Sequence, residues 1–300
     1  MTLLVWFSLV VLSVIWGSSF LFVELVVEHL SPFTIVFARV GIAAVALIAY
    51  CRIKRLRIPF EGKHIVQYAV MGFLAHAFPF TLITWGQTYI TAGLASIFNA
   101  TTPLFTVLVA HIYLKDERAS RIKFVGVFTG FAGVAVLLGG GMNGLTYDTL
   151  LGQLAGLGAA ISYAFSIVYG RRFSSLAPAG ISAATLTAAT VLIAPFALIY
   201  GSPGLQMPPF GALASLLMLA LLCTALAYII YYWILSSAGA TNLLLVTFLI
   251  PASAILLGAV FLNETLALNH VAGLALILCG LVLVDGQILR FFSRRWIGRA

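Results

Sequence analysis

Charged side chains are scarce in this sequence. Asp, Glu, Lys and Arg together make up 8% of the 300 residues, whereas hydrophobic residue types make up 62%. A soluble domain is about half apolar and roughly a quarter charged, so a chain of this composition cannot present a polar surface to water. The shortage of charge excludes a water-soluble globular protein and indicates a chain that is solvated by lipid.

Cysteines and catalytic motifs are also few. The three cysteines stand far apart, at Cys51, Cys223 and Cys279. Because no CxxC spacing occurs, we expect neither a disulfide framework nor a metal site, and no other cofactor. The motifs GxSxG and HExxH are missing, as is a pair of mid-membrane aspartates. An intramembrane enzyme that uses Ser18 or Ser19 with His76 is an alternative, and so is a scaffold that transports nothing.

Ten long apolar runs follow one another along the chain. A segment needs roughly 20 mostly apolar residues to cross the hydrocarbon core of a bilayer. Such runs cover residues 3–26, 32–51, 64–85, 91–114, 121–140, 150–170, 180–200, 211–236, 240–262 and 270–290. The first run lacks the basic leader and the cleavage site of a signal peptide, so we expect it to remain as a helix. The runs predict an all-α integral membrane protein with ten transmembrane helices.

Basic residues are sorted between the loops. Of the 16 Lys and Arg residues, 15 fall on one side of the predicted membrane, and the loops on the other side hold none. Loops rich in Lys and Arg stay in the cytoplasm during insertion, so both termini are predicted to be cytoplasmic, in a plasma (inner) membrane. The net charge of +8 therefore reflects topology and not binding to nucleic acid. The basic tail, residues 291–300, is expected to lie on anionic lipid.

The two halves of the chain resemble each other. A shift of about 147 residues superposes similar positions: Trp16 on Tyr163, Ser19 on Ser166, Gly126 on Gly273 and, with one residue of slack, Pro103 on Pro251. Residues 1–140 and 150–290 would then form two repeats of five helices. Because five is odd, the second repeat must enter the membrane upside down. Inverted repeats predict alternating access, with the substrate bound in a central cavity at mid-membrane.

Three stretches resemble the EamA family of the drug/metabolite transporter superfamily, namely Trp16 to Leu47, Leu114 to Leu138 and Phe261 to Val284. The similarity extends over nearly the whole chain. It implies ten helices, cytoplasmic termini and export of a metabolite such as an amino acid, and the chain looks most like amino-acid exporters with aromatic preference. One departure is that the second half has Leu186 where the first has Arg39, so any role of that arginine is not doubled.

Polar and aromatic side chains gather about twelve residues into the predicted spans, which at ~1.5 Å per residue is mid-membrane. The candidate substrate-binding residues are Trp16, Ser19, His76, Asn99, Pro103, Tyr163, Ser166, Tyr228, Thr247 and Pro251. Trp16 and Tyr163 either stack on an amphipathic solute or simply pack. An ionisable group at this depth is costly, so His76 is either functional or a neutral imidazole bonded within the bundle.

A proline interrupts one predicted span in each half. Pro103 and Pro251 each free the backbone carbonyl four residues earlier, on Asn99 and on Thr247. Freed backbone groups cannot face lipid. We therefore expect these carbonyls to line the path of the solute, or to be satisfied by neighbouring helices.

Arg39 is the only Lys or Arg in the interior of a predicted span, because Arg121, Lys123 and Arg290 stand at span ends. It lies about 10 Å below the outer surface, at a height that Glu24 could reach. A pair lowers the cost of burying either charge, so our preferred interpretation is a structural ion pair between Glu24 and Arg39. Binding of a substrate carboxylate by Arg39 is the alternative.

Acidic residues are missing from mid-membrane depth. A proton-coupled exporter of lipophilic cations would be expected to keep a buried carboxylate, and a sugar phosphate would call for more than one basic residue. The sequence therefore favours a small neutral or zwitterionic metabolite, with amino acids, aromatic ones included, as the predicted substrates. Facilitated movement or exchange fits better than tight ion coupling. Export of other small metabolites or of drugs is the alternative.

Glycines recur on the fifth and tenth spans. They are Gly126, Gly130 and Gly133 on the former and Gly273 and Gly280 on the latter. Small residues let helix backbones approach closely, so the stripe predicts a tight helix contact. We expect this contact within the chain of a monomer, and a homodimer through helices five and ten is the alternative.

The charge sorting generates a topology test. Cysteines introduced at Asn143 and Gly204 should react with a membrane-impermeant reagent from outside the cell, and cysteines at Arg57 and Arg295 only from the cytoplasmic side. Reporter fusions at the same four positions give an independent measurement. Reaction from the opposite side at any of them contradicts the ten-helix arrangement.

Overall fold

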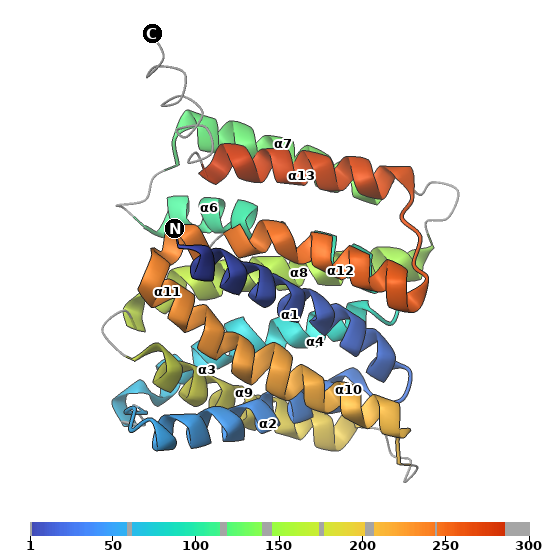
Figure 1. Cartoon of the computed structure of the whole chain (residues 1–300). Helices are drawn as coiled ribbons and strands as arrows, with labels where there is room; N and C mark the ends of the chain where they lie inside the picture. Colours follow the sequence, from blue (N-terminus) through green and yellow to red (C-terminus); the bar gives the residue numbers. More distant parts are fainter. Residues whose placement is uncertain are drawn as a thin grey trace.

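The structure, a computed structural model, is a bundle of helices (Figure 1). It describes residues 2–58, 62–114, 119–139, 146–173, 177–201, 207–243 and 245–285. Within these ranges every regular element is helical, and no strand occurs. The basic tail 291–300 and the topology positions Asn143, Gly204 and Arg295 lie outside the described residues.

Seven predicted spans are single helices. These are α1 (Leu3–Val27), α2 (Pro32–Ile53), α7 (Arg121–Gly139), α8 (Tyr147–Gly170), α9 (Pro178–Tyr200), α12 (Leu245–Leu262) and α13 (Leu268–Asp285). Short 3-10 turns precede the third span (η1, Gly62–His64) and follow α8 (η3, Arg171–Phe173).

The other three spans are composite. The third consists of α3 (Ile65–Gly72), the π-helical turn η2 (Phe73–Ala77) and α4 (Phe78–Gly86). The fourth consists of α5 (Ala92–Asn99) and α6 (Thr102–Tyr113). The eighth consists of α10 (Phe210–Ala220), the π-helical turn η4 (Leu221–Leu226) and α11 (Ala227–Leu243).

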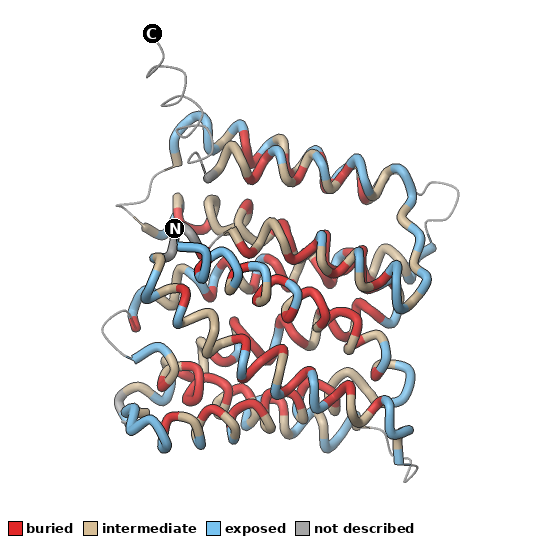
Figure 2. Tube along the Cα trace, viewed as in Figure 1, coloured by how far each residue is buried: buried red, intermediate tan, exposed pale blue. Residues whose placement is uncertain are grey.

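The helices are long enough to cross a bilayer. Nine helical segments of the described residues have the length and hydropathy of membrane spans, and Leu268–Val284 forms a slightly shorter apolar tenth. Exposed positions lie along the outside of the bundle (Figure 2), and many of them carry large apolar side chains. Phe128 is 72% exposed and Leu198 is 87% exposed. Such a surface suits lipid and not water, so the chain is an all-α, multi-pass membrane protein.

The predicted ninth span, residues 240–262, contains α12 (Leu245–Leu262). The helix direction changes just before this span, at Gly239, which has a positive φ of 78° within α11. Glycine adopts this backbone conformation without a steric penalty, whereas residues with a Cβ do not.

Hydroxyl side chains cap the N-termini of several helices. Thr2 caps α1, Ser31 caps α2, and Thr91 caps α5, each accepting a hydrogen bond from a backbone N–H of the first turn. These bonds satisfy donors that a helix cannot satisfy by itself. At α5 a carboxylate adds to the cap, because Glu264 accepts bonds from the backbone N–H groups of Ala92 and Gly93, both at 2.9 Å. Glu264 thereby ties the second half of the chain to the first.

The packing of the helices repeats between the two halves. Helix α1 packs against α12, and its counterpart α8 packs against α5 and α6. Helix α1 also packs against α10 and α11, as α8 packs against α4. The equivalent helices α2 and α9 pair at one edge of the bundle, and α7 and α13 pair at the opposite edge (Figure 1). This exchange of partners is what two inverted five-helix repeats predict.

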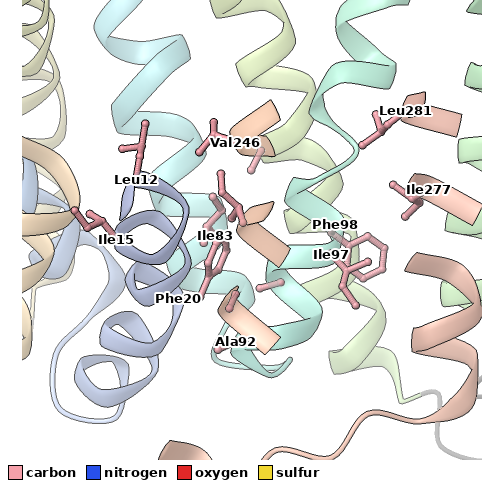
Figure 3. Packing of buried hydrophobic residues seen from close by; sticks show 14 of the residues in the cluster. Leu12, Ile15, Phe20, Ile83, Ala92, Ile97, Phe98, Val246, Ile277 and Leu281 are labelled. Carbon is pink, nitrogen blue, oxygen red and sulfur yellow. The ribbon is translucent and has the colours of Figure 1, made fainter. Parts of the chain in front are cut away.

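Two apolar cores hold the helices together. The larger includes Leu12, Phe20 and Ile83 near α1 and Phe98 and Ile277 near α13 (Figure 3). The smaller lies around α2 and α9 and consists of Val36, Val40, Ala43, Leu47, Leu186 and Ala189 with their neighbours. The composite third and eighth spans contribute to both: Cys223 packs in the larger core, and Ala225 in the smaller. These two spans therefore lie where the cores meet.

The glycine stripes bring α7 and α13 into backbone contact. A Cβ on Gly133 would stand 2.6 Å from the carbonyl oxygen of Gly273, and one on Gly126 would stand 2.6 Å from that of Gly280. The close contact predicted from the stripes is thus formed within the chain. A homodimer through other faces of these two helices stays a prediction.

Gly133→Ala should destabilise the protein, because the added methyl group meets backbone atoms that cannot rotate away. We expect a loss of roughly 1–3 kcal/mol, typical of overpacking, measured as a lower thermal midpoint of the purified protein in detergent. Gly211→Ala is the matched control, since a Cβ at that helical position meets nothing within 4 Å. Equal midpoints for the two variants would show that α7 and α13 are not in tight contact.

Candidate functional site

The two π-helical turns occupy equivalent positions in the repeats. Phe73, the first residue of η2, corresponds to Leu221, the first of η4, when the repeat shift is applied with one residue of slack. A π-helical turn places backbone hydrogen bonds five residues apart, widens the helix and often occurs at functional sites. Each half therefore interrupts one span at the same place.

Local chemistry explains the turn in the first half. Pro79 has no N–H for the carbonyl of Ala75, so a regular α-helix cannot continue there. Instead the N–H of Phe78 donates to the carbonyl of Phe73. The carbonyl of Leu74 accepts a 2.8 Å hydrogen bond from Ser162 Oγ of α8. A hydroxyl group from the other half thus satisfies part of the interrupted backbone.

No proline interrupts the turn in the second half. There the N–H of Ala227 donates to the carbonyl of Leu222, and Thr224 Oγ1 donates to the carbonyl of Leu219 at 2.8 Å. The hydroxyl of Thr224 takes the place of a backbone donor. It also remains free to accept a hydrogen bond from another side chain.

His76 lies in η2 and is bonded on both ring nitrogens. Nε2 is 3.2 Å from Thr185 Oγ1 of α9, and Nδ1 is 3.3 Å from the hydroxyl of Tyr228 of α11. The side chain is 2% exposed. The ring also contacts Tyr228 edge-on, with centroids 5.6 Å apart. The first half thus places an imidazole against two hydroxyl groups of the second.

Arg39 of α2 makes the equivalent contact with the other π-helical turn. Its Nε donates to Thr224 Oγ1 at 3.0 Å, and its guanidinium carbon lies 3.8 Å above the centre of the Phe80 ring. A cation over an aromatic face is attracted by the negative charge on that face. The second turn therefore holds Arg39 as the first holds Thr185.

Aromatic side chains line the same region. Tyr228 stacks on Tyr232 with centroids 6.1 Å apart, and Tyr231 touches both. Trp16 of α1 reaches Tyr231 at 5.7 Å. Tyr232 is bonded to Ser182 of α9. The ring contacts thus join α1 to α11, and the bond between Tyr232 and Ser182 continues the connection to α9.

Four of the predicted residues meet in this region. His76 and Tyr228 are bonded directly, Trp16 joins them through Tyr231, and Tyr163 packs against both apolar cores. We call Arg39, His76, Phe80, Tyr163, Thr185, Thr224 and Tyr228 the central cluster. Among the described carboxylates none bonds to a member of it.

Ser19 and Ser166 make equivalent hydrogen bonds within their own helices. Ser19 Oγ donates to the carbonyl of Trp16, and Ser166 Oγ to that of Tyr163, both at 2.8 Å. The matched serines thus satisfy backbone groups beside the matched aromatic residues.

The proline positions differ between the halves. Pro103 stands in the first turn of α6 after a break in the helix, whereas Pro251 lies inside the continuous helix α12 and is buried. The carbonyl of Asn99 accepts a hydrogen bond from Thr102 Oγ1 at 2.8 Å. It is therefore satisfied within its own span, and not by a neighbouring helix. Asn99 Oδ1 is buried and has no hydrogen-bond partner among the described residues. Thr247 is half-buried on α12.

The predicted ion pair between Glu24 and Arg39 is wrong. Glu24 accepts a 3.0 Å hydrogen bond from Gln87 Nε2 of the third span, while Arg39 binds Thr224 and Phe80. A similar height along the span did not bring the two together, because Glu24 is bonded to the third span and Arg39 to the eighth. The buried cation is thus left without an acidic partner among the described residues.

Sequence reasoning missed three members of the cluster: Phe80, Thr185 and Thr224. Threonine and phenylalanine are ordinary packing residues in an apolar span, so their type carries no signal. Two indirect signals existed. Pro79 follows His76 closely, and Thr185 precedes Leu186, the counterpart of Arg39.

The serines and the histidine of the enzyme alternative make no hydrogen bond with each other. Ser18 Oγ donates to the carbonyl of Ile15 and lies 3.5 Å from Cys223 Sγ, and Ser19 is bonded within its own helix. His76 is occupied by Thr185 and Tyr228. In the described ranges no three His, Cys, Asp or Glu side chains group together as a metal site would need.

The sequence is similar to several bacterial transporters over most of its length. It is 24% identical over 275 residues to the uncharacterized transporter YoaV of Bacillus subtilis (strain 168), covering 91% of this chain and 94% of that protein. It is 29% identical to the uncharacterized transporter YvbV of the same organism, covering 91% and 89%. It is 26% identical to the uncharacterized inner membrane transporter YedA of Escherichia coli (strain K12), covering 92% and 89%.

The fold and the family agree with these similarities. A protein of known crystal structure superposes with a TM-score of 0.67 over 94% of this chain and 96% of its own, at 19% sequence identity. At that identity the likeness establishes the fold alone. The sequence model of the EamA-like transporter family matches twice, over residues 3–139 and 150–285. Because the two matches span nearly the whole chain, the protein belongs to the EamA-like transporter family.

Proposed function

We propose that this transporter exports small neutral or zwitterionic metabolites, and that its substrates are amino acids, including aromatic ones. The observation that carries the proposal is the central cluster. Two matched π-helical turns bring one guanidinium, one imidazole, several hydroxyl groups and aromatic rings together, with no described carboxylate among them.

The chemistry of the cluster suits a zwitterion. Aromatic faces attract apolar side chains and ammonium groups, and hydroxyl groups bind either charged end without carrying charge themselves. A lipophilic cation would meet Arg39 and find no counter-charge. A sugar phosphate would find a single guanidinium for its two negative charges. Amino acids with apolar or aromatic side chains satisfy all these groups together.

The position of the cluster supports alternating access. His76 binds Thr185 and Tyr228, and Arg39 binds Thr224, so each of these bonds joins the first repeat to the second. A rocking motion of one half against the other would break and remake them. Sites at the interface of inverted repeats are exposed to each side of the membrane in turn by such motions.

The remaining features of the proposal follow from the same groups. Because no described carboxylate bonds to the central cluster, we propose facilitated movement or exchange instead of tight proton coupling. Because the hydroxyl groups of Ser18 and Ser19 do not contact His76, transport is favoured over hydrolysis. We further propose a plasma (inner) membrane with both termini in the cytoplasm, from the sorting of Lys and Arg.

Uptake into proteoliposomes should show the substrate class. We expect phenylalanine and threonine to move, and a hexose phosphate and a quaternary ammonium dye to be excluded. Trp16→Ala should reduce phenylalanine transport by a few fold to about tenfold and spare threonine, because an aromatic pair contributes roughly 0.5–1.5 kcal/mol and only phenylalanine can stack.

Trp85→Ala is the matched control. Trp85 also contacts a tyrosine, Tyr89, with centroids 5.3 Å apart, but it lies at the end of α4, away from the central cluster. That variant should transport phenylalanine and threonine in the wild-type ratio. Robust movement of the hexose phosphate or the dye, with no amino-acid flux, would overturn the proposal.

A further inference from the structure

Arg39 is a buried cation without a counter-charge in the described part of the protein. Its side chain is 6% exposed, and it forms no ion pair with a described carboxylate. Glu24, the partner expected from the sequence, is bonded to Gln87 instead. Removing an isolated charge from water is costly unless an opposite charge or strong hydrogen bonds compensate it. An anion bound to the guanidinium would lower the cost of burying this unpaired charge.

The guanidinium is only partly engaged by the protein. It can donate from Nε and from both Nη nitrogens, and the Nε donor is used by Thr224. Neither Nη nitrogen has a hydrogen-bond partner among the described residues. An enclosed Nη atom without a partner would be a buried unsatisfied donor, and neither Nη atom of Arg39 is one. Both therefore keep some accessible surface. The Nη donors, which with Nε form the fork that binds carboxylates, are therefore open to an acceptor from outside the chain.

The neighbours of Arg39 suit the remainder of an amino acid. Tyr163 and Tyr228 pack in the same apolar core as Phe80, and Tyr228 is bonded to His76, whose ring contacts that of Phe80. Their rings can contact an apolar side chain or an ammonium group, and their hydroxyl groups can bind either end. Phe80 covers one face of the guanidinium, so an anion approaches from its edge, in the plane of the donors.

The second repeat adds no matching charge. Leu186 occupies the position equivalent to Arg39 and is fully buried in the smaller core. Thr185, beside it, binds His76 instead. A single guanidinium neutralises one carboxylate and leaves a second anionic group unpaired. With a single guanidinium, the central cluster would suit solutes that carry one carboxylate.

We propose that Arg39 is the carboxylate-binding residue of the transport site, and that the solute is a monocarboxylate whose apolar part faces Tyr163 and Tyr228. The proposal rests on the proposed function, because it takes the central cluster as the place where the solute binds. Arg39 then has two roles: its Nε holds Thr224 and the π-helical turn, and its Nη groups hold the solute.

Three related ligands test the proposal with the wild-type protein. Phenylalanine carries a carboxylate and an ammonium group, phenylalaninamide only the ammonium, and 3-phenylpropionate only the carboxylate. Their apparent affinities are measured by the rise of the thermal midpoint of the purified protein and by competition for phenylalanine uptake. We expect the amide to bind roughly 10- to 100-fold more weakly than phenylalanine, as the loss of a charge-assisted hydrogen bond implies. The propionate should bind more tightly than the amide.

Variants separate binding of the solute from support of the turn. Arg39→Leu, which copies the residue of the second repeat, should lower the affinity for phenylalanine to that for the amide and leave the amide unchanged. Arg39→Lys keeps the charge and should retain part of the preference for the carboxylate. Arg172→Leu is the matched control, because it removes an exposed arginine whose contact is Tyr169, outside the central cluster. It should keep the wild-type preference.

Each outcome decides the matter. If phenylalanine is transported but the wild-type protein binds the amide equally well, Arg39 only positions Thr224; the inference is then wrong while the proposed function stands. An unchanged carboxylate preference in Arg39→Leu overturns it equally. If no amino acid moves but stabilisation by 3-phenylpropionate is lost in Arg39→Leu, the anion site is supported and the proposed substrate is rejected. If Arg39→Leu does not fold, the comparison of acid with amide in the wild-type protein decides alone.

Discussion

In the hydrocarbon core of a membrane, a backbone N–H or C=O group that leaves its helix must find another partner within the protein, because no water replaces the lost bond. Both π-helical turns are built around this constraint. Ser162 reaches from α8 to the carbonyl of Leu74, and Thr224 turns back to the carbonyl of Leu219. The hydroxyl group of Thr224 also accepts the hydrogen bond of Arg39. The same hydroxyl group therefore satisfies the interrupted helix and joins the polar cluster.

The contacts between the halves fall into two kinds. Helices α7 and α13 meet through glycines with their backbones in contact, and Glu264 binds two backbone N–H groups of α5. Contacts of this kind resist sliding, since a small displacement makes backbone atoms collide or breaks a double hydrogen bond. The bonds of the central cluster are single hydrogen bonds between side chains. A transport motion that preserves the first kind and exchanges the second would open the cluster while the bundle stays assembled.

The scaffold is symmetric and the site is not. The same helix pairs occur in both halves, and the π-helical turns stand at equivalent positions. Yet one turn presents an imidazole to Thr185 and the other presents a hydroxyl group to Arg39. The two repeats thus present equivalent positions with different side chains, and only the first repeat carries an arginine at the position that is Leu186 in the second.

The sequence alone determined the features that depend on whole segments, and it did not determine those that depend on the direction of single side chains. Apolar length, the sorting of Lys and Arg and the repeat are properties of whole segments, so the spans, the two-repeat architecture and the resemblance to the EamA family could be predicted from residue order. Within the site, depth along the helix selected His76, Tyr228 and Trp16 correctly as neighbours of one region. Depth says nothing about the direction in which a side chain leaves its helix. That direction depends on how helices rotate against each other and on where a π-helical turn shifts the register, and for this reason only the tertiary structure separated Glu24 from Arg39 and brought Thr224 and Phe80 to the guanidinium.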